Sequence, residues 1–190
     1  MKKIVFILMF VFAFMVAVAM TFAQSADSVS QSGNHKYVGA GKCKLCHSTD
    51  KIGAQFKNWE ASQHAHAYAD LASDTAKAVA KPRGIDDPQK APQCLKCHET
   101  GYGQPPSMFE ASFNPQDGVQ CESCHGPGSD YWKLSTMKGI QEKTIDAAQV
   151  GLIMPTKELC MTCHNQGSPF FHGFDFSADS AKIAHPLTAN

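Results

Sequence analysis

The chain begins with an uninterrupted apolar run. Lysines at positions 2 and 3 precede apolar residues that continue to position 19, where Ala17 and Ala19 form an Ala-x-Ala pattern. This order is typical of a secretory signal peptide, so we predict that residues 1–23 are cleaved and that the mature chain is exported. A membrane anchor is the alternative, because the run is just long enough to span a bilayer, but Ala-x-Ala favours cleavage. No later apolar run is long enough to cross a membrane.

A helical pattern follows between residues 51 and 73. Ile52, Phe56 and Trp59 recur at helical spacing, and several alanines lie after them. This spacing predicts helix. His64 and His66 are two residues apart, which corresponds to about 200° around a helix axis. Their side chains should therefore face different neighbours.

A second helical pattern lies near the C-terminus. Ser177 is a suitable N-cap for a short helix that carries His185 and ends at Pro186. Four phenylalanines surround His172 just before this helix. The remaining chain lacks long periodic segments, which predicts short helices joined by long loops.

The composition provides few large apolar residues from which such a fold could build a core. Only 25 of the 167 residues from 24 to 190 are Leu, Ile, Val or Phe, about 15%. Chains below roughly 20% tend towards disorder. Yet 15 Lys and Arg against 17 Asp and Glu leave this part with a net charge of only −2, which is not typical of a disordered chain. An apolar group from outside the polypeptide should complete the core.

Four short motifs supply sites for such a group: "CKLCH" (43–47), "CLKCH" (94–98), "CESCH" (121–125) and "CMTCH" (160–164). Zinc sites use paired Cys-x-x-Cys motifs, and thioredoxin-like sites use one as a redox dithiol, but neither needs a histidine after the second cysteine. Cys-x-x-Cys-His is the signature of c-type haem attachment, in which two thiols bond to the porphyrin and the histidine binds the iron. We therefore predict four covalently attached haem c groups, bonded to Cys43, Cys46, Cys94, Cys97, Cys121, Cys124, Cys160 and Cys163.

The motif spacing also predicts the domain organisation. The first cysteines are 51, 27 and 39 residues apart, so the chain is not an array of equal repeats. We predict a mainly α fold with long loops, in which one multihaem cytochrome domain (43–190) wraps around the four haems. Residues 24–42 are expected to form a polar N-terminal arm.

The histidine inventory predicts the iron ligands. The motifs provide the proximal ligands His47, His98, His125 and His164. Five histidines remain for four open positions, so each iron has a candidate second imidazole: His35, His64, His66, His172 and His185. Iron with two imidazole ligands suits electron transfer rather than substrate binding. We find no other acid and base constellation, so no catalytic residue is predicted.

These segments resemble the cytochrome c-554 family of exported tetrahaem cytochromes, from "YVGAGKCKLCH" through "WEASQHAHAY", "CLKCHETGYG" and "GVQCESCHGPG" to "CMTCHN". The resemblance implies parallel and perpendicular haem pairs, two histidine ligands on most irons and a role in passing electrons. It implies a distal ligand at His64 and another at His185. The sequence departs from the family after "CHGPG", where "SDYWKLSTMKG" lacks the distal histidine that the family places there.

His35 is a candidate for the missing ligand. It lies in the polar segment "SADSVSQSGNHKYVG", which favours a mobile arm. We hypothesise that His35 binds an iron of its own chain or of a neighbouring copy, and the second arrangement would build an extracellular filament. The expected partners are redox proteins, with no nucleic acid and no membrane span in the mature chain, and the expected location is periplasmic or extracellular. The alternative function is a multihaem oxidoreductase in which one five-coordinate haem acts on a small nitrogen oxide.

Overall fold

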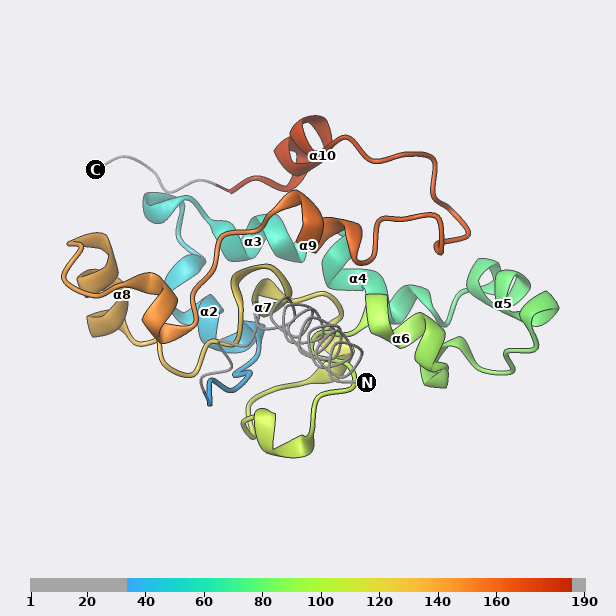
Figure 1. The fold of residues 1–190 in the computed structure, drawn as a ribbon, viewed down its shortest axis with the longest axis horizontal. Coiled ribbons are helices and arrows are strands. Elements are labelled where there is room, and N and C mark those ends of the chain that lie inside the picture. Colours follow the sequence, from blue (N-terminus) through green and yellow to red (C-terminus); the bar gives the residue numbers. More distant parts are fainter. Residues whose placement is uncertain (1–33, 186–190) are drawn as a thin grey trace, which may run out of the picture. The chain divides into compact units, whose positions relative to one another are not determined.

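Short helices and long connections make up the described part of the chain (Figure 1). The structure is a computed structural model that describes residues 34–185, so the predicted signal peptide lies outside the described residues. The α-helices in this range are α2 (Ala40–His47), α3 (Gln55–Glu60), α4 (Gln63–Asp70), α5 (Asp74–Ala80), α6 (Pro92–His98), α7 (Cys121–His125), α8 (Leu134–Gln141), α9 (Lys157–Met161) and α10 (Phe176–Ile183).

Short 3-10 helices lie between them: η1 (Asp50–Ile52), η2 (Lys81–Arg83), η3 (Pro88–Lys90), η4 (Pro106–Met108), η5 (Pro115–Asp117) and η6 (Ala147–Val150). Within residues 34–185 the only extended pairing is an isolated parallel bridge between Tyr37 and Phe109. The prediction of a mainly α chain with long loops is therefore confirmed. No helix in this range is long and apolar enough to cross a bilayer.

The helical pattern of residues 51–73 is divided into separate helices. The backbone of Ser62 is extended, with φ −90° and ψ 159°, between α3 and α4. The Ser62 hydroxyl donates a hydrogen bond to the carbonyl of Trp59 at 2.7 Å. Such bonds compete with the helical backbone pattern. His64 and His66 both lie on α4.

The C-terminal helix differs from its prediction in both ends. Its N-cap is Asp175, whose carboxylate accepts a hydrogen bond from the backbone of Ala178 at 2.9 Å, so the predicted cap Ser177 lies inside the helix. The backbone leaves the helical region at Ala184, with ψ 135°. His185 therefore lies beyond α10, in agreement with the steric effect of a following proline on the residue before it.

Three of the four haem motifs share one local geometry. α2, α6 and α7 each end at the histidine of a motif, and α9 contains the first cysteine of the fourth. One helical turn places the two cysteines of a motif on the same side. After α7 the chain turns at Gly126, with φ 79°, and a Cβ there would meet the carbonyl of Gly151. This close approach requires glycine after the third motif.

A buried carboxylate connects the N-terminal segment to the third motif. Glu122 is 2% exposed. It accepts backbone hydrogen bonds from Val38 at 2.8 Å, Gly39 at 2.7 Å and Gly128 at 2.7 Å. Val38 and Ala40 are each 1% exposed. Residues 36–40, at the described end of the segment expected to form a polar arm, are thus bonded to the third motif, and the boundary at residue 42 stays a prediction.

The apolar core is small and unevenly placed. The buried apolar side chains of the described residues are Val38, Ala40, Phe56, Ala67, Leu71, Ala80, Ala91, Leu95 and Tyr131. Four of the nine are alanines, so the side chains themselves fill little volume. All of them precede residue 132, although three α-helices follow it. This distribution agrees with the low content of large apolar residues in the sequence.

Candidate haem sites

Attachment cysteines of different motifs lie close together. Cys121 and burial raise the pKa of Cys43, burial and Cys163 raise that of Cys97, and burial and Cys160 raise that of Cys124. α2 also packs against α7. The first motif therefore lies near the third, the third near the fourth, and the fourth near the second. Groups attached to these motifs would lie in one continuous cluster.

The protonation of the thiols argues against a redox dithiol. Burial raises the pKa of Cys97 to about 12 and that of Cys124 to about 11. Burial also raises the pKa of Cys94 and of Cys160. Reactive dithiols need a thiolate with a lowered pKa. The pKa of Cys121 is lowered, but the cause is Cys43 of a different motif rather than the other cysteine of its own motif.

The proximal histidines are held by one ring nitrogen. Nδ1 of His98 lies 2.6 Å from the carbonyl oxygen of Ala67, and Nδ1 of His125 lies 3.1 Å from that of Ile153. A carbonyl oxygen can only accept, so Nδ1 carries the proton and Nε2 presents a lone pair. Metal-binding histidines usually have this arrangement. The two rings are therefore oriented as iron ligands.

In the first motif a side-chain amide, rather than a backbone carbonyl, holds the proximal histidine. Nδ1 of His47 lies 3.3 Å from Oε1 of Gln55, and the amide nitrogen of Gln55 donates to the carbonyl of Ile52. This second bond fixes which end of the amide faces the histidine. The ring of His164 in the fourth motif instead stacks on Phe174, with centroids 5.2 Å apart.

Two proximal histidines have a second imidazole at the separation that a shared metal ion requires. The ring centroids of His64 and His164 are 6.0 Å apart, and those of His125 and His185 are also 6.0 Å apart. Two imidazoles bound to one metal ion through bonds of about 2.0–2.1 Å have centroids about 6 Å apart. The rings meet edge to face, at interplanar angles of 65° and 73°.

Burial favours the neutral form of these imidazole rings, which is the form that binds a metal ion. Desolvation lowers the pKa of His64 and of His125. A metal ion needs the neutral imidazole, because the protonated ring has no free lone pair. The residues at these two sites therefore fit an iron porphyrin with two histidine ligands.

The surface around the motifs also fits an apolar group. Leu45, inside the first motif, is 72% exposed, Met154 is 74% exposed and Phe170 is 57% exposed. A porphyrin is a large, flat and mostly apolar surface that such side chains can cover. By contrast, no cluster of three or more His, Cys, Asp and Glu residues within 34–185 is arranged to hold a bare metal ion.

The other candidate distal ligands are placed differently. His66 and His172 have no imidazole in ring contact within the described chain, and neither do His47 and His98. Nδ1 of His35 lies 2.6 Å from Oδ2 of Asp130. The structure thus places two of the candidate distal ligands, His64 and His185, beside proximal histidines, and the other candidates stay predictions.

Several residues with a supporting role had no clear signal in the sequence. The carbonyls of Ala67 and Ile153 act through the backbone, which side-chain identity does not reveal. Glu122 occupies a variable position of its Cys-x-x-Cys motif, and Asp130 lies 95 residues from His35. Only the fold brings these partners together.

Comparison with known proteins agrees with this geometry. Residues 42–126, which contain the first three motifs, match the family described as "Cytochrome c554 and c-prime". The chain is 29% identical to cytochrome c-554 of Nitrosomonas europaea over 82% of its own length and 69% of that relative. It is also 29% identical to the multiheme cytochrome MtrA of Shewanella baltica, over 43% of the chain and only 25% of that protein. No solved structure matches the chain significantly.

Motifs, ring geometry and similarity all agree with the class of c-type cytochromes. Within that class, the chain resembles the cytochrome c-554 family.

Proposed function

We propose that this chain is an exported tetrahaem c-type cytochrome that transfers electrons between redox proteins. The observation that carries the proposal is the arrangement of the four motifs, because thiols of the third motif lie near those of the first and the fourth, and thiols of the second lie near those of the fourth. Haem iron, when bound, supplies one-electron redox chemistry. The polypeptide fixes the spacing of the sites and the ligands of each iron.

The roles of the residues follow from their contacts. The eight motif cysteines attach the haems, and His47, His98, His125 and His164 bind the irons. We assign His64 to the iron of His164 and His185 to the iron of His125, because of their ring separations of 6.0 Å. Two imidazoles keep an iron six-coordinate in both oxidation states, so the protein rearranges little during transfer.

His35 supports a local ligand role better than a role in a neighbouring copy. Its side chain is 14% exposed, and it lies against Gly151 and Asp130 of its own chain. These contacts hold the ring against its own chain, which favours the local role. The filament hypothesis instead requires Nε2 of His35 to reach the iron of a neighbouring copy. Size measurement of the purified protein with and without His35→Ala tests it, since only the filament requires the variant to disassemble.

The enzyme alternative also has an observation in its favour. His47 and His98 have no second imidazole in ring contact in the described chain. An iron with one histidine would be high-spin and open to a small ligand such as a nitrogen oxide. His66, His172 and His35 are the residues available to close these two positions.

Two measurements on the exported protein test the proposal. Denaturing mass spectrometry should show four added haems, and a product without added mass at the cysteine pairs would overturn it. The electron paramagnetic resonance spectrum of the ferric protein should contain only low-spin signals. A high-spin signal that responds to added nitric oxide would instead favour the enzyme. Spectra of the double variant His66→Ala/His172→Ala would then show whether these rings complete the open positions.

A further inference from the structure

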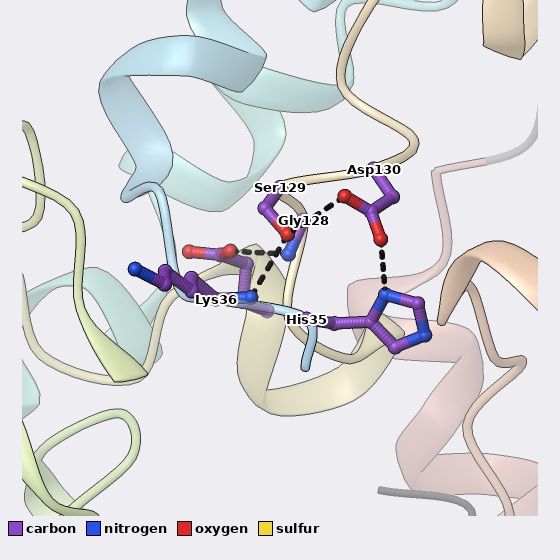
Figure 2. Close-up of polar contacts among 6 residues, drawn as sticks. His35, Lys36, Gly128, Ser129 and Asp130 are labelled. Atoms are coloured by element: carbon purple, nitrogen blue, oxygen red, sulfur yellow. Dashed lines mark hydrogen bonds and ion pairs between the residues drawn. The ribbon is translucent and has the colours of Figure 1, made fainter. Parts of the chain in front are cut away.

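The segment that carries His35 runs beside the chain that follows the third motif. The backbone nitrogen of Lys36 donates to Oγ of Ser129 at 2.9 Å, and the backbone nitrogen of Ser129 donates to the carbonyl of Lys36 at 3.0 Å. Figure 2 shows His35 extending from this pairing towards the side chain of Asp130. These two hydrogen bonds of the Lys36 backbone fix the position of His35 independently of the bond that its ring makes.

The ring of His35 is then oriented by a carboxylate. Its Nδ1 donates to Oδ2 of Asp130 at 2.6 Å, a short distance for a hydrogen bond between nitrogen and oxygen (Figure 2). The other carboxylate oxygen of Asp130 accepts from the hydroxyl of Ser129 at 3.2 Å. The ring also lies against Gly151, where an added Cβ would be 2.8 Å from Cδ2 and 3.3 Å from Nε2 of His35.

Among the nine histidines, which all lie in the described chain, this is the only ring with a carboxylate on Nδ1. The corresponding partners of His98, His125 and His185 are backbone carbonyls, and that of His47 is an amide oxygen. A carboxylate makes imidazole a stronger donor to a metal ion than a neutral acceptor does. His35 should therefore be the most electron-rich imidazole of the set.

We propose that Asp130 is a positioning residue that holds His35 with Nε2 free as an axial ligand and lowers the reduction potential of the iron bound there. The inference rests on the proposed ligand role of His35. Charge on the carboxylate favours the ferric state, which carries one more positive charge than the ferrous state. Residues that support a metal ligand typically change metal affinity by about 10- to 100-fold. If Asp130→Asn weakens ferric binding tenfold relative to ferrous binding, the potential of one haem rises by about 59 mV.

The test compares variants of the intact holoprotein by redox titration of all four haems and by the ferric electron paramagnetic resonance spectrum. Asp130→Asn keeps the size of the side chain and removes its charge. It should raise one potential and leave that haem low-spin. Asp130→Glu, which restores the charge, should return the potential towards the original value. Asp74→Asn is the matched control, because it removes a fully exposed carboxylate from α5.

The variant His35→Ala distinguishes the ligand role of His35 from the positioning role of Asp130. If His35→Ala changes the ligation of one haem but Asp130→Asn moves no potential more than Asp74→Asn does, the positioning role is wrong and the ligand role stands. If His35→Ala leaves every spectrum unchanged, both roles of this pair are wrong, although electron transfer by the four haems is not. Adding Asp130→Asn to His35→Ala should have no further effect. A further shift in this double variant would mean that Asp130 acts on the haem without His35.

Discussion

The two parts of the described chain are stabilised in different ways. Residues 35–131 contain all nine buried apolar side chains and the buried carboxylate of Glu122. Residues 132–185 contain no buried apolar side chain, yet they carry the fourth motif, His172 and His185. After α9 the chain makes a long excursion before it returns to α10 (Figure 1).

Local hydrogen bonds define the helices of the second part. Asp146 caps η6, Thr156 caps α9 and Asp175 caps α10, each by accepting a bond from a nearby backbone nitrogen. Helices of eight residues or fewer are marginal in water without tertiary packing. Since polypeptide packing is scarce here, we infer that the attached haems provide most of it. The first part can retain its own packing when one haem is absent.

Removal of the fourth haem attachment is the strongest test of this difference. The variant Cys160→Ala/Cys163→Ala should lose one haem and expose residues 132–185 to limited proteolysis more than about tenfold faster, which corresponds to about 1.4 kcal/mol of local stability. Cys43→Ala/Cys46→Ala is the matched variant in the first part. Its residues 35–131 should be less affected, because apolar side chains still pack there. Equal cleavage of the two parts in both variants would contradict the comparison.

The variant Glu122→Ala tests how much the polypeptide itself stabilises residues 35–131. Glu122→Ala leaves the backbone nitrogens of Val38, Gly39 and Gly128 without their acceptor in a buried place. At about 1–3 kcal/mol for each buried unsatisfied group, with some relief from water, we expect a loss of about 3–5 kcal/mol in the free energy of unfolding. Urea unfolding followed by circular dichroism measures it. Glu158→Ala, an exposed glutamate in α9, should change little.

The same residue predicts a pH dependence. Burial raises the pKa of Glu122, although its three backbone hydrogen bonds act in the opposite direction. A raised pKa in the folded state adds stability below the unfolded pKa of about 4.3, and this stability is lost as pH rises through the folded pKa. The free energy of unfolding of the natural protein should therefore fall relative to Glu122→Gln over this range. A relative rise would mean that hydrogen bonds to the carboxylate outweigh its burial.

The sequence predicts the chemistry of the sites better than their arrangement. A fixed local spacing determines attachment, so the four Cys-x-x-Cys-His motifs identify their residues without a fold. The low content of large apolar residues likewise anticipates the small core. The histidine pairs are different, because His64 and His164 are 100 residues apart and periodicity alone gives no distance between them.

Where the structure differs from local sequence preference, the reasons are physical. The N-terminal segment contains many Ser and Gly residues and few charges, which favours a mobile arm, but Glu122 offers its backbone nitrogens a buried acceptor 83 residues away. The cap of α10 was misplaced because Ser177 and Asp175 are both good caps, and only the backbone shows that Asp175 is used. Tertiary contacts decide cases that local preference leaves open.

The smallest predicted effect concerns a single hydrogen bond that ties α3 to the chain before the third motif. Nε1 of Trp59 donates to the carbonyl of Val119 at 2.8 Å, and its ring packs on Phe56 with centroids 5.2 Å apart. Trp59→Phe retains most of the ring contact and removes the donor, so the free energy of unfolding should fall by about 1 kcal/mol. Asn58→Ala removes a neighbouring exposed side chain with a weak 3.4 Å contact and serves as the control. Because Trp59 belongs to the first part alone, proteolysis of residues 132–185 should stay unchanged in Trp59→Phe. Faster cleavage there would show that the two parts unfold together rather than separately.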